Sequence, residues 1–184
     1  MAFNINEMRS QLTGGGAKSA LFRVQIQNPV LGAADAIAPF MIKAASLPSS
    51  TLGSYEVGYF GRKIKYAGDR TFEPWDVTVI NDENFAIRNS LEAWMNAINS
   101  HETNLRLFGT SSANEYKTQA QITQYAKTGE VLRVYNFNGL FPTLVTPIEM
   151  NWDNTDQIEE FNVTFQYDWW NVAGGITGDA GTNS

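Results

Sequence analysis

The residues of this chain that could do chemistry are few, and their spacing argues against a catalytic centre. The run Gly14-Gly15-Gly16-Ala17-Lys18-Ser19 invites comparison with a phosphate-binding loop, but that motif needs Gly directly before Lys and a helix after it. Here Ala17 precedes the Lys and a strand pattern follows, so we interpret the run as a hinge. The one His, His101, follows a helical pattern, where the helix dipole favours it without any catalytic role.

Paired carboxylates and metal ligands are equally weak candidates. Glu159 and Glu160 are neighbours, but consecutive side chains of a strand point to opposite faces and cannot share one substrate. With no Cys and a single His, the chain lacks thiol nucleophiles, disulfides and the ligands of a typical zinc site. We therefore expect no catalytic residues, no metal site and no cofactor, and we expect that the chain is not an enzyme.

Charge and length narrow the class further. The chain has 184 residues, a length typical of one domain with a full core, and its net charge is −6. That balance argues against a protein that grips nucleic acid, because such binding relies on clustered Lys and Arg. The most basic segment is 62–65, where alternation places Arg62 on the face of Ile64 and puts Lys63 and Lys65 on the other face. Such charges discourage edge pairing unless a partner supplies carboxylates.

The elements that must position these residues are mainly β-strands. Apolar and polar residues alternate at 22–26, 75–79, 119–123, 131–135 and 148–153, and most clearly at 160–169, which predicts antiparallel strands with one wet face. One segment has helical spacing, with Ile87, Leu91 and Trp94 on one face, and it predicts a flanking α-helix over about residues 82–99. Asn81 or Asp82 is expected to cap this helix.

The two ends differ from this body. Residues 1–19 are predicted to be a flexible arm with a short helix bearing Ile5, Met8 and Leu12 in one stripe. Residues 20–170 are predicted to be a single domain, and the Gly-rich residues 171–184 a flexible tail. We expect a soluble protein with no signal peptide and no membrane anchor, because neither a basic region before an apolar run nor a membrane-length apolar stretch is present.

Short blocks distributed over most of residues 20–170 carry a family resemblance. They are 61–64, 67–72, Trp75, 77–79, 81–83, 115–117, 124–126, 139–140, 142–143, 152–153, Ile158, Phe161 and 163–164. In this order they resemble the tail tube proteins of contractile-tailed, T-even-like bacteriophages. The chain departs from that pattern at 33–39, at Phe141, where the family has Trp, and after Asn171.

The resemblance implies a mainly β fold, either a small β-barrel or a two-sheet antiparallel sandwich with one flanking helix, as in phage tail tubes and type VI secretion tubes. It implies a structural virion protein whose hexameric rings stack into the inner tail tube, the conduit for genome ejection into the host cell. The implied partners are further copies of the chain, the sheath protein, and baseplate and tail-terminator proteins at the tube ends. Tape measure protein and DNA would occupy the lumen without tight binding. Synthesis and assembly would take place in the cytoplasm of the host bacterium.

Two sets of site residues follow from the resemblance together with the residue pattern. Exposed aromatics on the Gly-jointed segment 47–68 indicate an inter-subunit or inter-ring contact, although a satellite core cluster is the ordinary alternative. The contact candidates are Leu52, Tyr55, Val57, Tyr59, Phe60, Arg62, Lys63, Lys65, Asp69 and Arg70. The polar positions of the alternating strands give the lumen-lining candidates, which are Gln121, Thr123, Asn162, Thr164 and Gln166. Carboxylates near them would repel phosphates and let DNA slide.

Three alternatives stay open at the level of sequence. A tube subunit of a phage-derived contractile injection system or bacteriocin shares the fold and is distinguished by its neighbouring genes. A ligand-binding β-sandwich would use the five Trp and seven Tyr, but most of these lie in the apolar phase, which core packing explains better. A hydrolase is disfavoured because the chain lacks the usual triad members.

Overall fold

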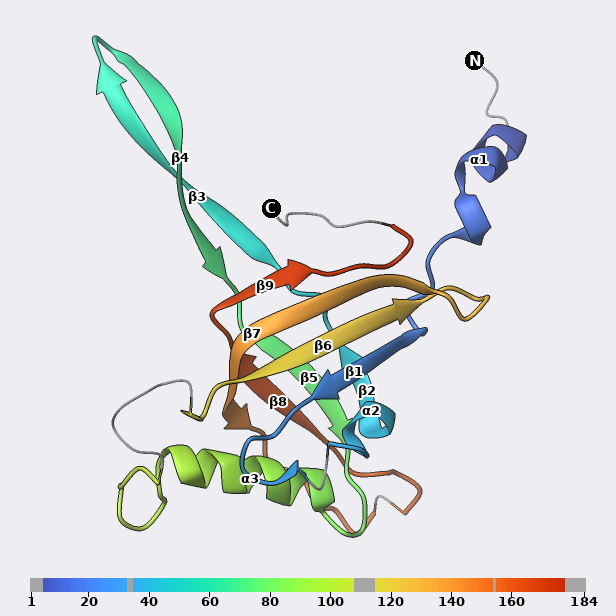
Figure 1. Cartoon of the computed structure of the whole chain (residues 1–184), viewed down its shortest axis with the longest axis vertical. Helices are drawn as coiled ribbons and strands as arrows, with labels where there is room; N and C mark the ends of the chain where they lie inside the picture. Colours follow the sequence, from blue (N-terminus) through green and yellow to red (C-terminus); the bar gives the residue numbers. More distant parts are fainter. Residues whose placement is uncertain (1–4, 33–34, 108–114, 154, 178–184) are drawn as a thin grey trace.

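The computed structural model describes residues 5–32, 35–107, 115–153 and 155–177, and antiparallel strands dominate this part of the chain (Figure 1). The elements are α1 (Ile5–Gln11), a 3-10 turn (Thr13–Gly15), β1 (Phe22–Ile26), α2 (Ala38–Met41), β2 (Ile42–Ala45), β3 (Ser50–Tyr59), β4 (Arg62–Phe72), β5 (Trp75–Ile80), α3 (Ala86–Ile98), β6 (Thr118–Tyr125), β7 (Val131–Val145), β8 (Glu160–Gln166) and β9 (Trp169–Val172).

The body is an antiparallel sheet system in the order β1-β6-β7-β8-β5-β2, with β9 paired to β7. Strand β7 belongs to two sheets, because residues 131–140 pair with β6 and residues 141–145 pair with β8. The hairpin of β3 and β4 forms a separate two-stranded sheet. This arrangement confirms the expected mainly β, two-sheet antiparallel fold with one long flanking helix.

The change of partner along β7 occurs at Gly139. Its φ is 70°, and it lies at the register shift where Thr118 faces Leu140 and Gln119 faces Asn138. A side chain here would overlap the carboxylate of Asp168, which accepts two hydrogen bonds from Lys117 Nζ at 2.7 and 2.8 Å. Glycine therefore satisfies both the positive φ and the close approach.

The core lies between the two sheets and is rich in aromatic side chains. Trp75 of β5 stacks on Phe137 of β7 with ring centroids 4.4 Å apart, and Phe165 of β8 lies 5.6 Å from the same Trp. All three are buried, as the alternation along β5 and β8 predicts. Burying each such side chain contributes about 1.5–3 kcal/mol.

Helix α3 lies at the lower end of the molecule in Figure 1 and packs its apolar stripe onto the core. Trp94 is fully buried, and its Nε1 donates to the backbone oxygen of Tyr116 at 2.9 Å. The helix begins at Ala86, four residues later than predicted, because Phe85 adopts a left-handed conformation with φ of 53°. The N-cap position is held by Phe85 rather than by the expected Asn81 or Asp82, but Asp82 Oδ1 accepts from Ala86 N at 3.0 Å and so satisfies the first N–H of the helix.

Two strand predictions were wrong. Residues 148–153 form a loop, because no described strand lies beside them to complete a ladder. The alternation over 160–169 spans two strands, since β8 ends at Gln166 and β9 begins at Trp169. Beyond β9, Ala173 N donates to Val134 O, so regular pairing with β7 continues past residue 170. Residues 1–4 of the predicted arm and 178–184 of the predicted tail lie outside the described residues.

Candidate functional site

The hairpin of β3 and β4 projects from the body at the end opposite to α3 (Figure 1). Its two-residue turn is Phe60-Gly61, with φ values of 43° and 80°, both positive as a type I′ turn requires. Every residue from 51 to 67 is exposed, and Phe72 at the base contacts the ring of Tyr167. Because an isolated two-stranded hairpin is marginal in water, this element indicates a surface that a partner covers.

The two faces of the hairpin differ in chemistry. Cross-strand pairs place Tyr55 opposite Tyr66, Val57 opposite Ile64, and Tyr59 opposite Arg62 on one face, which we call the apolar hairpin face. All five of its apolar side chains are about half exposed or more. The tyrosine rings of the first pair stack with centroids 5.6 Å apart. An ordered apolar stripe that the body does not cover is typical of a protein interface.

The opposite face carries the charges. Glu56 lies opposite Lys65, and its carboxylate oxygens are 3.0 Å from Lys63 Nζ and 3.7 Å from Lys65 Nζ. These pairs are exposed and contribute little to folding. One carboxylate against two ammonium groups leaves this face positive, and the face is therefore suited to a partner with carboxylates.

All ten predicted contact residues lie on this hairpin. Leu52 is exposed opposite Arg70, and Asp69 lies at the bulge where Gly53 approaches the facing backbone. The aromatics Tyr55, Tyr59 and Phe60 are all exposed, so they do not form the satellite core cluster considered from the sequence.

A second exposed apolar surface lies on the loop 146–159, which we call the acidic loop. Its side chains Met150, Trp152 and Ile158 are exposed, and Trp152 is 99% exposed. The loop frames a cavity of about 910 Å³ whose lining includes Glu149 and Glu159. Sequence reasoning missed this surface, because the alternation of its apolar residues was interpreted as a strand.

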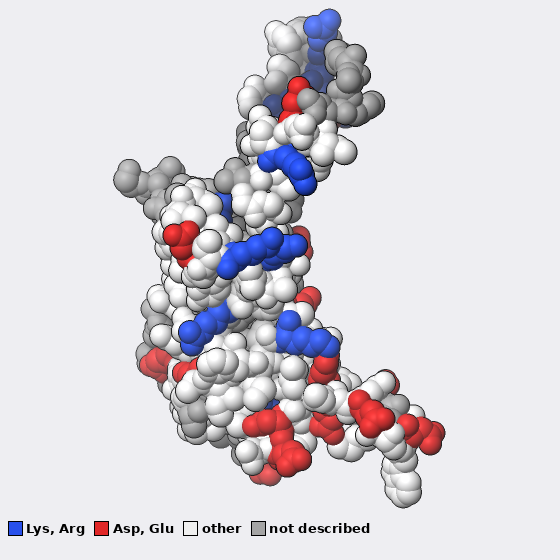
Figure 2. Space-filling view, turned by 90° about the vertical axis from the view of Figure 1, so that its right-hand side faces the viewer, with Lys and Arg blue, Asp and Glu red and all other residues white. Residues whose placement is uncertain are grey.

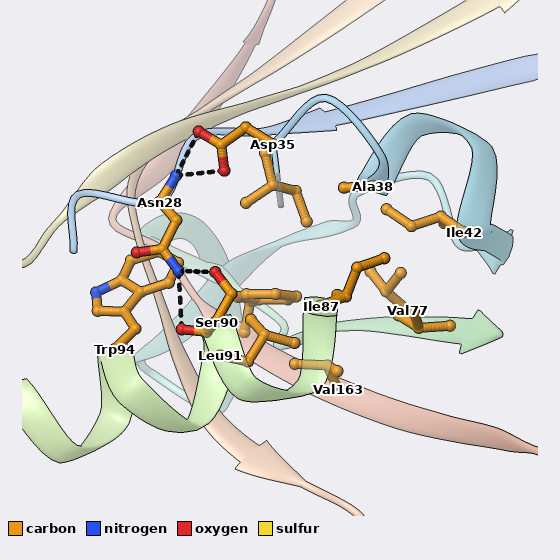
Figure 3. A pocket seen from close by; sticks show the side chains of 13 residues that line it. Asn28, Asp35, Ala38, Ile42, Val77, Ile87, Ser90, Leu91, Trp94 and Val163 are labelled. Carbon is orange, nitrogen blue, oxygen red and sulfur yellow. Dashed lines mark hydrogen bonds between the residues drawn. The ribbon is translucent and has the colours of Figure 1, made fainter. Parts of the chain in front are cut away.

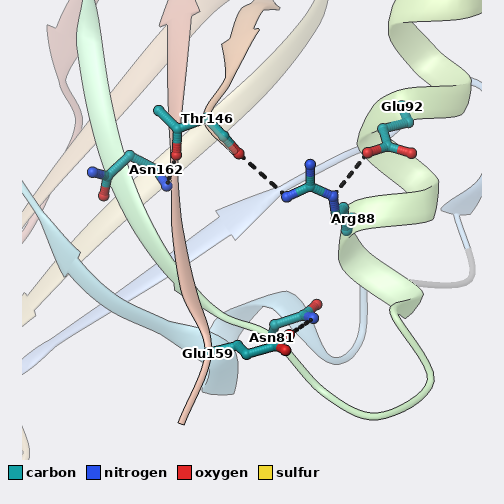
Figure 4. Close-up of polar contacts among 6 residues, drawn as sticks. All are labelled: Asn81, Arg88, Glu92, Thr146, Glu159 and Asn162. Carbon is teal, nitrogen blue, oxygen red and sulfur yellow. Dashed lines mark hydrogen bonds and ion pairs between the residues drawn. The ribbon is translucent and has the colours of Figure 1, made fainter. Parts of the chain in front are cut away.

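Both ends of the acidic loop are fixed to the body (Figure 4). At its start, Thr146 O accepts from Arg88 Nη1 of α3 at 3.3 Å, and Thr146 Oγ1 accepts from the backbone N–H of Asn162 at 2.8 Å. At its end, Glu159 Oε2 accepts from Asn81 Nδ2 at 2.8 Å. The exposed side chains are thus carried between anchored ends.

Charge is distributed unevenly along the molecule. Figure 2 shows Lys and Arg over the upper and middle parts and Asp and Glu gathered at the lower end. That end carries α3 and the acidic loop, and the hairpin extends toward the other end (Figure 1). The two exposed apolar surfaces therefore lie at opposite ends and in opposite electrostatic surroundings.

The predicted lumen residues lie on two different sheets. Asn162 and Thr164 are on the wet face of β8, where Asn162 Oδ1 accepts from Thr78 Oγ1 at 2.8 Å and Thr164 Oγ1 donates to Asp76 Oδ1 at 2.6 Å. Gln166, also on β8, is half-buried.

The other two lumen candidates are on β6. Gln121 is half-buried, and its Nε2 donates to Asn136 Oδ1 at 3.0 Å. Thr123 is only 8% exposed, so it offers little surface to a channel. The structure therefore places Asn162, Thr164 and Gln166 together on β8, and it places Gln121 and Thr123 on a different strand, β6.

A small cavity between α3 and β2 has the polar residues Asn28, Asp35 and Ser90 in an otherwise apolar lining (Figure 3). Asn28 Nδ2 donates to Ser90 O at 2.9 Å and to Ser90 Oγ at 2.7 Å, and Asn28 N donates to both Asp35 oxygens at 3.1 Å. Burial raises the pKa of the Asp35 carboxyl, although the Asn28 N–H opposes this shift. The free volume is about 30 Å³, which is enough for a single water. The hydrogen bonds of Asn28 therefore serve to tie its loop to α3.

The remaining sequence candidates show no chemistry. Gly14, Gly15 and Gly16 all have positive φ, and a strand rather than a helix follows them. Glu160 pairs with Lys43 at 2.6 Å, apart from the contact that Glu159 makes. Within the described residues, no group of three His, Asp or Glu could hold a metal ion, and no helix is long and apolar enough to cross a membrane.

Comparison with known proteins points in one direction. A family model for phage tail tube proteins matches residues 17–173. The chain is 38% identical over 132 residues to the tail tube protein gp19 of Enterobacteria phage T4, which covers 71% of this chain and 79% of that protein.

Two solved structures share the fold. One is the tube terminating cap of the anti-feeding prophage, with a TM-score of 0.63 and 18% identity over 85% of this chain and 90% of that one. The other is the sheath/tube terminator of an extracellular contractile injection system, with a TM-score of 0.62 and 15% identity over 85% and 96%. At these identities the likeness concerns the fold alone.

Proposed function

The chain belongs to the phage tail tube protein family, and we propose that its copies close into six-membered rings that stack through the β3–β4 hairpin. Membership confirms the resemblance seen in the sequence and makes the chain a structural tail tube component of the virion rather than an enzyme. The proposal concerns how copies meet, which partners they meet, and which surface faces the channel.

The observation that carries the proposal is the exposed apolar hairpin face. Val57, Ile64 and Tyr59 lie on a paired two-stranded ribbon that the body does not cover. Covering each such side chain on assembly contributes about 1.5–3 kcal/mol before the cost of association. Repeated around a ring, this contribution favours a stack over free rings.

The position of the hairpin supports a head-to-tail contact. It extends from one end of the molecule, and the opposite end carries α3 and a loop rather than a second hairpin (Figure 1). A contact between two unlike surfaces is heterologous, and it closes into rings or propagates as a filament according to its rotation. A tube needs one contact of each kind.

We assign the channel-facing role to the wet face of β5 and β8. Here Asn162, Thr164 and Thr78 satisfy one another or Asp76 by hydrogen bonds, so few donors are free to hold a phosphate. The carboxylate of Asp76 on β5 repels phosphates, whereas that of Glu160 on β8 is paired with Lys43 Nζ at 2.6 Å. We propose that Gln121, Thr123 and Gln166 contribute less to the channel surface than Asn162 and Thr164.

The proposed partners are those that the family resemblance implies. They are further copies of the chain, the sheath protein, baseplate and terminator proteins at the tube ends, and tape measure protein and DNA in the lumen. The proposed place of assembly is the cytoplasm of the host bacterium. A tube subunit of a phage-derived injection device or bacteriocin is the alternative, supported by the two structures of similar fold from such systems.

Negative-stain microscopy of the purified chain tests the stacking proposal. We expect hollow tubes of uniform diameter, abolished by Val57→Asp, because a buried unpaired charge opposes the contact. Val131→Asp is the matched control, since Val131 is also exposed on a strand but lies outside the hairpin. Monomers at every concentration of the unaltered chain, or tubes from Val57→Asp, would contradict the proposal.

The channel proposal has a separate test. Because the chain has no Cys, Asn162→Cys introduces a single thiol. In assembled tubes we expect that thiol to react with a small maleimide and to resist a maleimide on a polymer too large to enter the tube. The same variant, disassembled, must react with both. Equal reaction with the large reagent in tubes would remove β8 from the channel wall.

A further inference from the structure

We propose that Tyr167 and Glu73 form a latch at the root of the β3–β4 hairpin, open in the free chain and closed when the hairpin is covered in an assembly. In the closed state the Tyr167 hydroxyl donates a hydrogen bond to the Glu73 carboxylate and fixes the hairpin to the body. The inference rests on the proposed function for the covered state. It adds a conformational device inside the chain, which the contact between copies does not specify.

The hairpin is joined to the body by two short unpaired connections, 46–49 before β3 and 73–74 after β4 (Figure 1). The first connection is held by Trp75, whose Nε1 donates to Ser46 O at 2.9 Å. The second contains Pro74, which has no N–H to donate, and among the described residues no hydrogen bond ties this connection to the body. The root of the hairpin is therefore fixed on one side and free to rotate on the other.

Tyr167 lies against the free side of the root, in the turn between β8 and β9. Its ring centroid is 6.0 Å from that of Phe72, the last residue of β4, and 5.0 Å from that of Phe137 in the core. Tyr167 is only 8% exposed, and its buried Oη has no hydrogen-bond partner within the described part of the chain. A buried hydroxyl without a partner costs free energy, and buried tyrosines are normally bonded. This hydroxyl therefore indicates a second position of the root in which it is satisfied.

Glu73 supplies the matching acceptor. Burial raises the pKa of the Tyr167 hydroxyl, and the negative charge of the nearby Glu73 carboxylate raises it further. Glu73 is exposed and makes no hydrogen bond or ion pair with another described residue. Because Glu73 precedes Pro74, its backbone is confined to an extended conformation, so rotation of the root brings the carboxylate to the hydroxyl without refolding the connection. A hydroxyl that donates to a carboxylate makes a charge-assisted bond, which is stronger than a neutral one.

Covering the apolar hairpin face decides between the two positions. In the free chain the hairpin gains nothing from one fixed orientation, and the Glu73 carboxylate keeps its hydration. A contact on the apolar hairpin face already orders the hairpin, so closing the latch then costs less conformational entropy. A partner that binds one orientation more tightly shifts the population toward that orientation. A covered hairpin is thus stiff, whereas an uncovered one stays hinged.

A double-mutant cycle tests the latch. Tyr167→Phe removes only the hydroxyl and keeps the ring, and Glu73→Ala removes the acceptor. Each substitution should raise the protein concentration needed for tubes about tenfold, because the closed state loses a charge-assisted bond. The double variant should raise it no further, since either change alone removes the whole bond.

The free chain provides the contrast. In urea titrations below the concentration for assembly, the two substitutions should show no coupling. Tyr167→Phe should leave the unfolding midpoint unchanged or raise it, because the lost hydroxyl has no partner there. Tyr125→Phe and Glu130→Ala are the matched controls, since they remove a hydroxyl and a carboxylate beside the turn between β6 and β7. Both should leave the concentration for tubes within about twofold.

Hydrogen exchange of the backbone amides gives a structural readout. Amides of β4 next to Phe72 should exchange about tenfold more slowly in tubes than in the free chain, because the closed latch holds the root. In tubes of Tyr167→Phe this protection should be lost near Phe72 and retained at the hairpin tip. Equal protection near Phe72 in tubes of both proteins overturns the latch.

The outcomes separate the latch from the proposed function. Fully additive effects on tube formation, or tubes of Tyr167→Phe at the concentration of the unaltered chain, overturn the latch and leave the tube function intact. Equal coupling in the free chain also overturns it, because the bond would then be present in both states. Absence of tubes from the unaltered chain overturns the proposed function and the latch together.

Discussion

Replacing Gly139 by Ala should destabilise the folded chain through two causes that experiment can separate. The residue stands where β7 passes from one sheet to the other, with φ of 70°. An L residue in this left-handed region costs about 1–2 kcal/mol. The new methyl group would also overlap the side chain of Asp168 and force that carboxylate away from Lys117.

The cost of displacing Asp168 is limited by exposure. The side chain of Lys117 is 19% exposed and that of Asp168 is 51% exposed, so the ion pair contributes about 0.5–1 kcal/mol after solvent screening. The expected total for Gly139→Ala is therefore about 1.5–3 kcal/mol. With a urea m value of about 2–3 kcal/mol/M for a chain of this size, the unfolding midpoint falls by about 1 M.

Urea unfolding followed by tryptophan fluorescence, below the concentration for assembly, measures this change. Asp168→Ala alone should cost about 0.5–1 kcal/mol. Added to Gly139→Ala, it should cost nothing further or recover part of the loss, because the overlap is gone. Costs that add fully would refute the steric part of the reasoning, and a Gly139→Ala midpoint equal to that of the unaltered chain would refute both parts.

Three further predictions concern other sites. Phe60→Ser should leave the free energy of unfolding within about 0.5 kcal/mol, because the side chain is exposed, while raising the critical concentration for tubes by at least tenfold in sedimentation assays. Asn28→Ala should lower the free energy of unfolding by about 2–3 kcal/mol in urea titrations, since it removes the bonds to Ser90 and the acceptor for Val30 N. The pKa of Asp35 is raised by burial, so the folded state favours the protonated form, and the resulting stability is lost as pH rises from the ordinary Asp value through the folded pKa. The melting temperature of Asp35→Asn relative to the unaltered chain should therefore rise as pH is raised from 3 to 7, and a constant difference would contradict this sign.

Sequence pattern predicted the elements whose side chains alternate against a core. The strands β1, β5 and β8 and the helix α3 follow from alternation or helical spacing, because burial of one face imposes that period. The faces of segment 62–65 were also predicted, since Arg62 and Ile64 share one face as alternation requires. These features depend on neighbours in the sequence alone.

The errors have a common physical origin. The alternation over 148–153 gives the positions of apolar side chains only. A strand also needs a neighbouring strand to hydrogen-bond with, and no described strand lies beside this segment. The turn between Gln166 and Trp169 and the bend at Gly139 depend on tertiary contacts with Lys117 and β7 that no local pattern records. For the same reason the acidic loop was missed as a surface, because its apolar residues have no covering partner within the chain.

The glycine pair of the hairpin has a consequence for the helical parameters of a stack. At the bulge, the Cα of Gly53 faces Asp69 and that of Gly68 faces Gly53, and an added methyl at either site would lie 3.1–3.2 Å from the opposing backbone. The two backbones leave no room for a side chain at this bulge, and the bulge increases the local twist. In the proposed stack, this crossing would set the angle at which each hairpin tip leaves its ring, so the rotation and rise from one ring to the next would depend on Gly53 and Gly68.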